Sequence, residues 1–224
     1  MAQITVQKIR LLAAVLLLCP LAWAADEKKP AQAPTREILS QIEKNMAGIT
    51  TLSADFVQEK NLAAFQNKLI IKGKIFLAQP GRLAWHVDSP MKYSMVLDNA
   101  KVRQWDADSN QTQEMSLDRT PAVGMAIEQM KKWFSGAYSS LENDYRISLL
   151  SEKPTEFEFI PRDGNSAGKF ISVVKVRFRP DCRYISRIFI VEKNGDTTDL
   201  VFNEAQINTK IPAKAWQCGP VGSQ

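Results

Sequence analysis

Residues 73–90, GKIFLAQPGRLAWHVDSP, decide the fold of this chain. Apolar side chains alternate with other residues on both sides of the Gln-Pro-Gly turn at 79–81, and Pro90 ends the second run. A period of two indicates β-strands, and the Pro-Gly pair between the runs indicates a tight turn. The stretch therefore predicts an antiparallel hairpin whose strands span 68–78 and 82–88.

The period of two extends on both sides of this hairpin. Runs of alternating side chains separated by turn residues predict nine further strands, at 52–60, 93–98, 101–106, 111–117, 144–151, 155–161, 169–179, 184–193 and 196–207. The Asn194-Gly195 pair between the last two runs is a strong hairpin signal. Short strands at this spacing are typical of an antiparallel meander.

Two segments have helical periodicity instead. Thr35 can cap a helix whose apolar residues recur every three or four positions and which ends near Gly48. A second helix is predicted from Pro121 to about Phe134. This order indicates an α+β fold dominated by one strongly curved sheet of about 11 strands. Several strands are apolar on both faces, and either a single sheet folded around helices or a two-sheet sandwich would cover them.

The first 24 residues have the three parts of a secretory signal. Lys8 and Arg10 precede an apolar core at 11–18, which is too short to span a bilayer as a helix. A small-x-small pattern ends at Ala24, so cleavage is expected after that residue. We therefore expect export to a bacterial periplasm. Residues 25–34 are expected to form a flexible tether, and 35–224 a single domain.

The net charge of the chain indicates which partners it binds, and its cysteines indicate whether it forms a disulfide. Loss of the two basic signal residues lowers the formal net charge from +5 to about +3, which is mild. The remaining basic residues are scattered through strands as on a solvated face, so we expect a protein that binds no nucleic acid. A monomer is also expected. Cys182 and Cys218 remain after processing, and two cysteines in an oxidising compartment usually pair. A disulfide between them is expected.

The sequence shows no pattern of catalytic residues. His86 is the only histidine, and in its strand it alternates with Trp85 and Val87, so it points away from their face. One histidine and two cysteines expected to pair cannot supply a metal site, and no nucleophile or phosphate-binding motif is present. We expect a binding protein, without cofactor, metal or enzymatic activity.

Large apolar side chains remain to be explained. Leu83, Trp85 and Val87 share one strand face, and Ile75 and Leu77 share a face of the preceding strand. The second predicted helix adds Met130 and Trp133. One interpretation is an ordinary core. The other is a cavity for acyl chains, which need apolar walls and few polar groups because they form no hydrogen bonds.

Several of these stretches resemble one known family. Residues 52–58 (LSADFVQ) resemble the first strand of the LolA family of periplasmic lipoprotein carriers, and 73–90 resemble its second and third strands. Residues 96–106 are similar to the hairpin that follows, and 157–161 and 195–198 to later parts of the fold. The resemblance extends from about residue 36 to 216, and its most specific part is 73–90.

The resemblance implies an incomplete antiparallel barrel with helices as a lid over its open mouth. The cavity between them would hold the acyl chains of a lipoprotein, received from an inner-membrane transporter and passed to an outer-membrane acceptor. By motif position Leu83 matches a cavity residue of the family, and Ile75, Leu77 and Trp85 are its neighbours by strand parity.

One position departs from the family pattern. Where the carriers have an arginine that latches the lid, this chain has Gln79, and Arg82 is a candidate to replace it. A neutral amide forms weaker hydrogen bonds than a guanidinium group. This departure fits a related protein that carries another lipid as well as it fits a lipoprotein carrier. The cargo is therefore expected to be a lipoprotein or another acylated lipid. The alternative function is a periplasmic sensor or regulator of the same fold that binds a membrane-protein partner.

Overall fold

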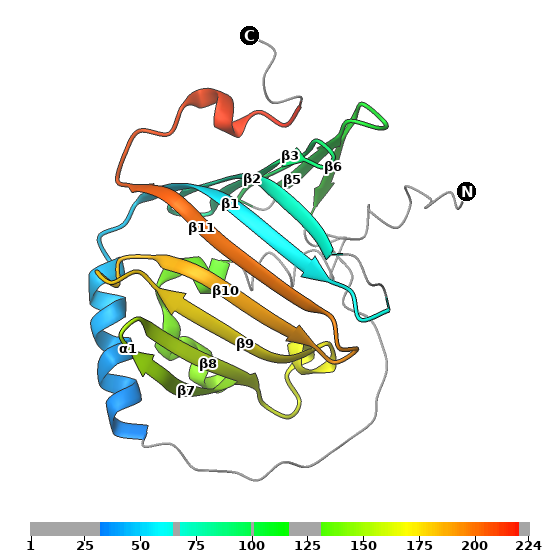
Figure 1. Ribbon diagram of the computed structural model, residues 1–224. Helices are drawn as coiled ribbons and strands as arrows, with labels where there is room; N and C mark the ends of the chain where they lie inside the picture. Colours follow the sequence, from blue (N-terminus) through cyan, green and yellow to red (C-terminus); the bar gives the residue numbers. More distant parts are fainter. Residues whose placement is uncertain (1–31, 65–67, 100, 117–130, 220–224) are drawn as a thin grey trace.

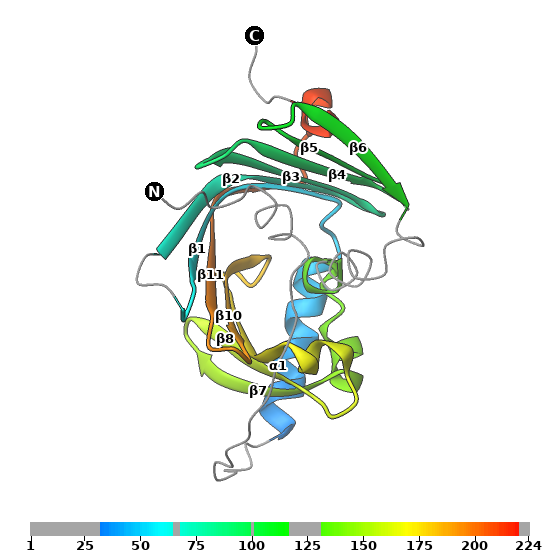
Figure 2. The same cartoon turned by 90° about the vertical axis from the view of Figure 1, so that its right-hand side faces the viewer.

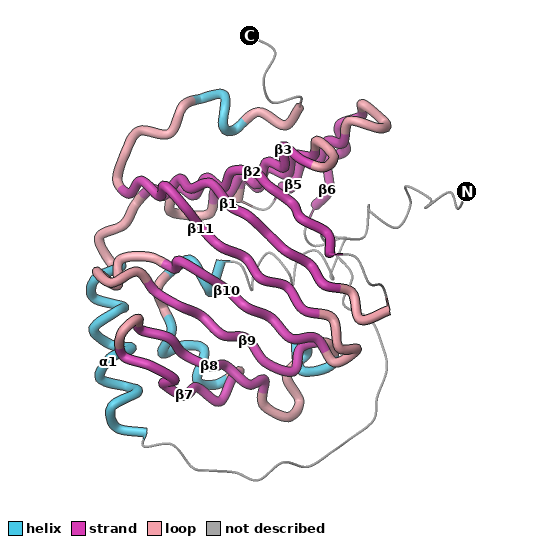
Figure 3. The backbone as a smooth tube through the Cα atoms, in the orientation of Figure 1, coloured by secondary structure: helices cyan, strands magenta, loops and turns pink. Residues whose placement is uncertain are grey.

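The computed structural model describes residues 32–64, 68–99, 101–116 and 131–219. Strands make up most of this part of the chain (Figure 3). The strands are β1 (Thr51–Asn61), β2 (Lys68–Ala78), β3 (Arg82–Ser89), β4 (Tyr93–Asp98), β5 (Lys101–Asp106), β6 (Gln111–Ser116), β7 (Tyr145–Glu152), β8 (Thr155–Pro161), β9 (Ile171–Phe178), β10 (Ile185–Glu192) and β11 (Thr197–Ile207).

Helical elements are few in this part of the chain. The α-helix α1 spans Gln32–Met46, and a further helical turn covers residues 131–135. The described residues also contain three short 3₁₀ helices, η3 (Tyr138–Asn143), η4 (Ser166–Lys169) and η5 (Ala213–Trp216). Helix α1 begins three residues before the predicted Thr35, inside the predicted tether, and most of the second predicted helix lies outside the described residues. No helix in the described ranges is long and apolar enough to cross a membrane.

All eleven strands form one antiparallel sheet in the order β6-β5-β4-β3-β2-β1-β11-β10-β9-β8-β7. The first strand pairs with the last, as in the pairing of Val57 with Val201, so two meanders meet in the middle of the sheet. β6 and β7 are the two free edges, and the sheet curves strongly without closing (Figures 1 and 2). The predicted incomplete barrel of about 11 strands is confirmed, and the two-sheet sandwich is wrong.

A glycine allows close approach where the sheet turns from β1 to β3. Gly73 on β2 pairs with Phe56 on β1, and the register to β3 shifts between Lys72 and Gly73. A Cβ atom at Gly73 would lie 1.9 Å from the carbonyl oxygen of His86 and 2.9 Å from the Phe56 ring. Only glycine fits between these groups, because neither backbone nor a packed ring can move aside cheaply.

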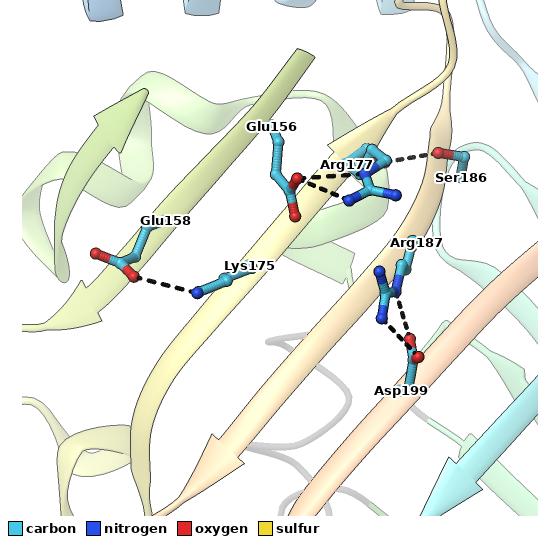
Figure 4. Close-up of polar contacts among 7 residues, drawn as sticks. All are labelled: Glu156, Glu158, Lys175, Arg177, Ser186, Arg187 and Asp199. Atoms are coloured by element: carbon cyan, nitrogen blue, oxygen red, sulfur yellow. Dashed lines mark hydrogen bonds and ion pairs between the residues drawn. The ribbon is translucent and has the colours of Figure 1, made fainter. Parts of the chain in front are cut away.

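The convex face of the sheet carries charged side chains that pair with one another. Figure 4 shows these residues on β8 to β11. Arg177 bonds Glu156 at 2.9 Å, and Arg187 makes two 2.7 Å hydrogen bonds to Asp199. Lys175 lies 3.9 Å from Glu158. These pairs neutralise the convex face of this half of the sheet, while the alternate side chains form the core on its concave side.

Helix α1 and the segment after residue 130 cover the concave face (Figure 2). Leu39, Ile42 and Met46 of α1 are buried in the main core. They share it with apolar residues from both meanders, including Phe56, Ile75, Phe157, Phe159, Val174, Val176, Ile188 and Phe202. The expected single sheet folded around helices is therefore confirmed.

Residues 208–219, called the C-terminal strap here, fold back over the convex face of β3 to β5. The Nε2 atom of His86 lies 2.8 Å from the carbonyl oxygen of Ala215, and Arg103 donates to the carbonyl of Trp216 at 3.2 Å. The Arg82 guanidinium stacks 4.2 Å from the centre of the Trp216 ring. The strap covers the side of β3 that faces away from the core.

The predicted disulfide is wrong, because Cys182 and Cys218 are both free thiols. The Cys218 sulfur lies 3.5 Å from the Ser94 hydroxyl on β4, where the strap places it. The Cys182 sulfur lies 3.5 Å from the Thr155 hydroxyl on β8. Six strands separate β4 from β8 in the sheet order, and each thiol lies against a different one of these two strands. Cysteine count and compartment contain no information on this distance.

Candidate functional site

The predicted cavity residues of β2 and β3 lie on the concave face. Ile75 pairs with Trp85 across the two strands, and Leu77 pairs with Leu83. Ile75 and Leu83 are fully buried, whereas Leu77, Trp85 and Val87 are half-buried. All five therefore point to one side because strand parity places them there, as the sequence pattern predicted.

This face joins two apolar clusters. The main cluster contains α1 and the concave side of both meanders. The second, which we call the β3–β5 cluster, contains Leu83, Met95, Leu97 and Val102, with Leu77, Trp85, Tyr93 and Met115 packed against it. Leu77 and Trp85 contact both clusters. They make the concave face continuous from β6 to the opposite wall of the barrel, which is the half of the sheet that contains β7 to β11.

Aromatic rings line the opposite wall and its cover. Trp133, in the helical turn at 131–135, packs edge-on against Phe159 of β8 with ring centroids 4.6 Å apart. Phe134 packs edge-on against Phe202 of β11 at 5.6 Å. Trp133 thus lies between the helical cover and the sheet. Met130 lies outside the described residues.

Two polar contacts hold the helical cover together. Arg36 of α1 forms a two-pronged ion pair with Glu142 of η3, at 3.0 and 3.2 Å. Glu43 of α1 accepts hydrogen bonds of 2.6 Å from both the backbone amide and the hydroxyl of Ser139. We call α1 together with residues 131–143 the lid. These contacts couple its two parts, which lie far apart in the sequence.

Asn208 anchors the lid to the end of β11. Its side-chain amide donates to the carbonyl of Gly48 at 2.9 Å and accepts from the backbone amide of Thr50 at 2.8 Å. Its own backbone amide donates to Thr51 at 2.9 Å. Asn208 has a positive φ of 57°, which asparagine tolerates better than most residues. The residue therefore fixes the connection between α1 and β1.

The lid rests closely on the sheet. A pocket of about 20 Å³ lies where they meet, which is room for about one water molecule. Its lining comes from the end of α1, the start of β1, the end of β2 and the β9–β10 turn, and includes Met46, Ile49, Leu52, Leu77, Gln79, Phe134, Arg183 and Tyr184. An acyl chain at this point requires the lid to move away from the sheet.

The two predicted latch residues lie on different faces. Gln79 is exposed at the mouth, beside the end of α1 and Phe134, and its side chain makes no hydrogen bond to another described residue. Arg82 lies on the convex face, where it stacks on Trp216 and lies 3.5 Å from Asp98. The structure thus directs Arg82 towards the strap and away from the lid.

Buried tyrosines near the face remain uncharged. The Tyr138 hydroxyl donates to the carbonyl of Trp133 at 2.7 Å, and burial raises the pKa of Tyr138 far above its ordinary value. Burial, with a smaller effect of Asp144, raises the pKa of Tyr145 to about 12. Burial likewise raises the pKa of Tyr93. In the described ranges, no three acidic, histidine or cysteine side chains are grouped to bind a metal ion.

Sequence reasoning missed part of this face. Phe56 and the β4 residues Met95 and Leu97 belong to it, although strand parity alone could have placed the β4 residues beside Trp85 and Leu83. Phe157 and Phe159 also alternate regularly in their strand. Their position opposite β2 depends on the β1–β11 pairing, for which the sequence has no local signal.

Comparison with known proteins supports this description. Residues 47–218 match the family described as "Outer membrane lipoprotein carrier protein LolA". The "Outer-membrane lipoprotein carrier protein" of Pseudomonas entomophila is 26% identical over 212 residues, which cover 92% of this chain and 91% of that protein. The protein of the same description from Legionella pneumophila is 25% identical, over 83% of this chain and 90% of that one.

Solved structures share the fold. MucB in the MucA/MucB complex of Pseudomonas aeruginosa is 12% identical with a TM-score of 0.53, over 83% of this chain and 61% of that chain. An uncharacterized conserved protein from Thermus thermophilus is also 12% identical, with a TM-score of 0.50, over 85% of this chain and 97% of that one. At this identity the likeness concerns the fold alone.

Proposed function

The chain belongs to the LolA family of outer-membrane lipoprotein carrier proteins, and we propose that it holds the acyl chains of a lipoprotein or another acylated lipid against its concave face. The observation that supports this most is the apolar surface that Leu77 and Trp85 make continuous between two clusters. Lipid tails bind through desolvation and dispersion, at about 0.8 kcal/mol for each buried methylene. Such a surface can therefore hold them without specific contacts.

We propose that binding exchanges one set of apolar contacts for another. In the closed form, Leu39, Ile42 and Trp133 of the lid occupy the concave face. Cargo must displace them, so the net affinity is the difference between two similar burial terms. The two parts of the lid move together because Arg36 and Glu142 connect them. A small difference of this kind suits a carrier, which must also release its cargo.

The position of Gln79 suggests how firmly the lid closes. The family resemblance places a latching arginine at this position, and here an exposed neutral amide lies beside the end of α1. Closure then depends on apolar packing and on the Asn208 anchor. We propose that the closed form is less favoured here than in carriers with the arginine.

The proposed route follows from the family and from residues 1–24. The signal would be cleaved after Ala24, and the mature protein would carry its cargo across the periplasm from an inner-membrane donor to an outer-membrane acceptor. N-terminal sequencing of the exported protein tests the first step. We expect it to begin at Ala25, and soluble protein with an intact Met1 would contradict export.

A second candidate function is a sensor or regulator that binds a protein partner. The observation in its favour is the fold shared with MucB, which has been solved in complex with MucA. In this case a ligand would bind to the concave face and change the position of the lid. A membrane-protein partner would bind differently to the two positions.

Native mass spectrometry of protein purified from the periplasm distinguishes the two candidates. We expect acylated lipid bound to the wild type and lost from Leu83→Glu, since a carboxylate among apolar walls is costly to bury. Leu150→Glu is the matched control, because Leu150 is 46% exposed. A co-purifying protein without lipid would favour the regulator. Lipid bound equally by wild type and folded Leu83→Glu would remove the concave face from the site.

A further inference from the structure

Tyr93 combines a buried ring with an unsatisfied hydroxyl. It is the first residue of β4, and its ring packs against the β3–β5 cluster on the concave side. Its hydroxyl oxygen is buried and has no hydrogen-bond partner among the residues that the structure describes. Two other buried polar atoms in the described ranges, Arg82 Nε and His86 Nδ1, also lack a hydrogen-bond partner. Arg82 and His86 each make another polar contact, whereas Tyr93 has no other side-chain polar atom.

An unsatisfied buried hydroxyl lowers stability, because it has lost its hydrogen bonds to water without replacement. A phenylalanine at position 93 would fill almost the same space without this cost. The hydroxyl is therefore explained best by a bound partner, since the described part of the chain provides none. Its location on the cargo face indicates which kind of molecule that partner belongs to.

The chemistry of the surroundings narrows the partner further. Burial raises the pKa of Tyr93, and the nearby Cys218 and Asp106 raise it more, so the phenol remains a neutral donor. Asp106 pairs with Tyr93 in the β4–β5 register, and a carboxylate there disfavours an anionic ligand. A neutral acceptor fits both observations. In a fatty acyl group, the only such acceptor is the carbonyl oxygen of its ester or amide linkage.

We propose that the Tyr93 hydroxyl donates a hydrogen bond to the ester or amide carbonyl of the cargo, and so fixes how deep the acyl chain lies on the concave face. This inference rests on the proposed acyl-binding function and goes further, since it assigns a polar anchor to a surface that otherwise binds only hydrocarbon. It predicts that the protein distinguishes acyl cargo from alkyl cargo of the same chain length.

The test compares two soluble probes, dioctanoylglycerol with ester linkages and dioctylglycerol with ether linkages. We expect the wild type to prefer the ester, and Tyr93→Phe to bind the ester about fivefold more weakly with unchanged affinity for the ether, as loss of one neutral hydrogen bond implies. Tyr138→Phe is the matched control, because that hydroxyl already bonds Trp133. Its ester-to-ether ratio should equal that of the wild type.

A second measurement does not depend on the variant folding. The infrared stretch of a carbonyl labelled with carbon-13 should shift to lower frequency when the ester binds the wild type. An unshifted carbonyl, or equal ester-to-ether ratios in wild type and Tyr93→Phe, would overturn the inference while leaving acyl binding intact. If the wild type binds neither probe, the acyl-binding function itself fails and the inference fails with it.

Discussion

The ring of Phe56 stacks on the indole of Trp85 with centroids 4.0 Å apart, and Gly73 lies on the strand between them. The two rings come from β1 and β3, which are not neighbours in the sheet. They can meet because β2 contributes no side chain at this position. The indole that connects the two apolar clusters is therefore positioned by a glycine.

Gly73→Ala should destabilise the fold more than most single substitutions. The new Cβ would lie 1.9 Å from the His86 carbonyl oxygen, so the backbone of β3 must move. We expect a loss of about 3 kcal/mol in the free energy of unfolding, the upper end of overpacking effects, measured in urea. Gly48→Ala is the control, because its Cβ would meet nothing within 4 Å. Equal stabilities of the two variants would contradict the close approach.

Gln79→Arg should weaken the apparent affinity for a fluorescent acyl probe severalfold and speed release to acceptor vesicles. A charged contact is worth roughly 1.5–3 kcal/mol against about 1 for a neutral one, so an arginine at the mouth favours the closed lid. The apparent affinity of a ligand that must first open the lid is its intrinsic affinity multiplied by the fraction of open protein, so it falls as the closed lid becomes more favoured. Arg82→Gln, on the convex face, should leave both quantities unchanged. Tighter binding by Gln79→Arg would exclude a latch at this position.

Substitutions at Asn208 should loosen the lid. Asn208→Gly keeps the positive φ but removes the side-chain hydrogen bonds to Gly48 and Thr50. We expect the free energy of unfolding to fall by about 1–2 kcal/mol. Asn208→Ala should lose about 1 kcal/mol more, because alanine is strained at that φ. Hydrogen exchange should show a larger loss of protection in α1 than in β11. Unchanged exchange in α1 would mean that Asn208 does not anchor the lid.

Protein cleaved after Ala24, as proposed, should contain two free thiols when titrated under denaturing, non-reducing conditions. In the folded protein, burial raises the pKa of Cys218, so its thiolate should form at higher pH than an ordinary thiol. The folded state therefore keeps a proton that the unfolded state loses. This contribution to stability is complete below the unfolded cysteine pKa of about 8.5 and is lost as pH rises through the folded pKa. A titration that finds no free thiol would show that Cys182 and Cys218 form a disulfide after all.

Local patterns predicted the strands well and the sheet order poorly. The strand at 68–78 and those at 93–98 and 101–106 have the predicted bounds, because a period of two and the intervening turns are local signals. The position of Ile75, Leu77, Leu83 and Trp85 on one face followed from the same parity. The β1–β11 pairing depends on burial across the whole domain, which no short window contains.

The unsatisfied Tyr93 hydroxyl and the path of the strap were not predictable for a related reason. Both depend on distances of a few ångströms between segments that are remote in sequence, such as Ser94 and Cys218. The failed disulfide shows the same limit, since residue counts describe composition and not position. Arg82 was similarly considered for the mouth from its distance along the chain, whereas strand parity directs it to the opposite face.

The pairing of Val57 with Val201 affects the order of events during folding. Each meander can pair its own neighbouring strands early, because their turns are short. The two halves cannot join until β11 has emerged, since this strand lies between β1 and β10. Closing so long a loop is slow, and folding slows as contacts become less local. A chain whose last strand has not yet formed would thus contain two unjoined meanders, and the single sheet would be completed only when β11 pairs with β1.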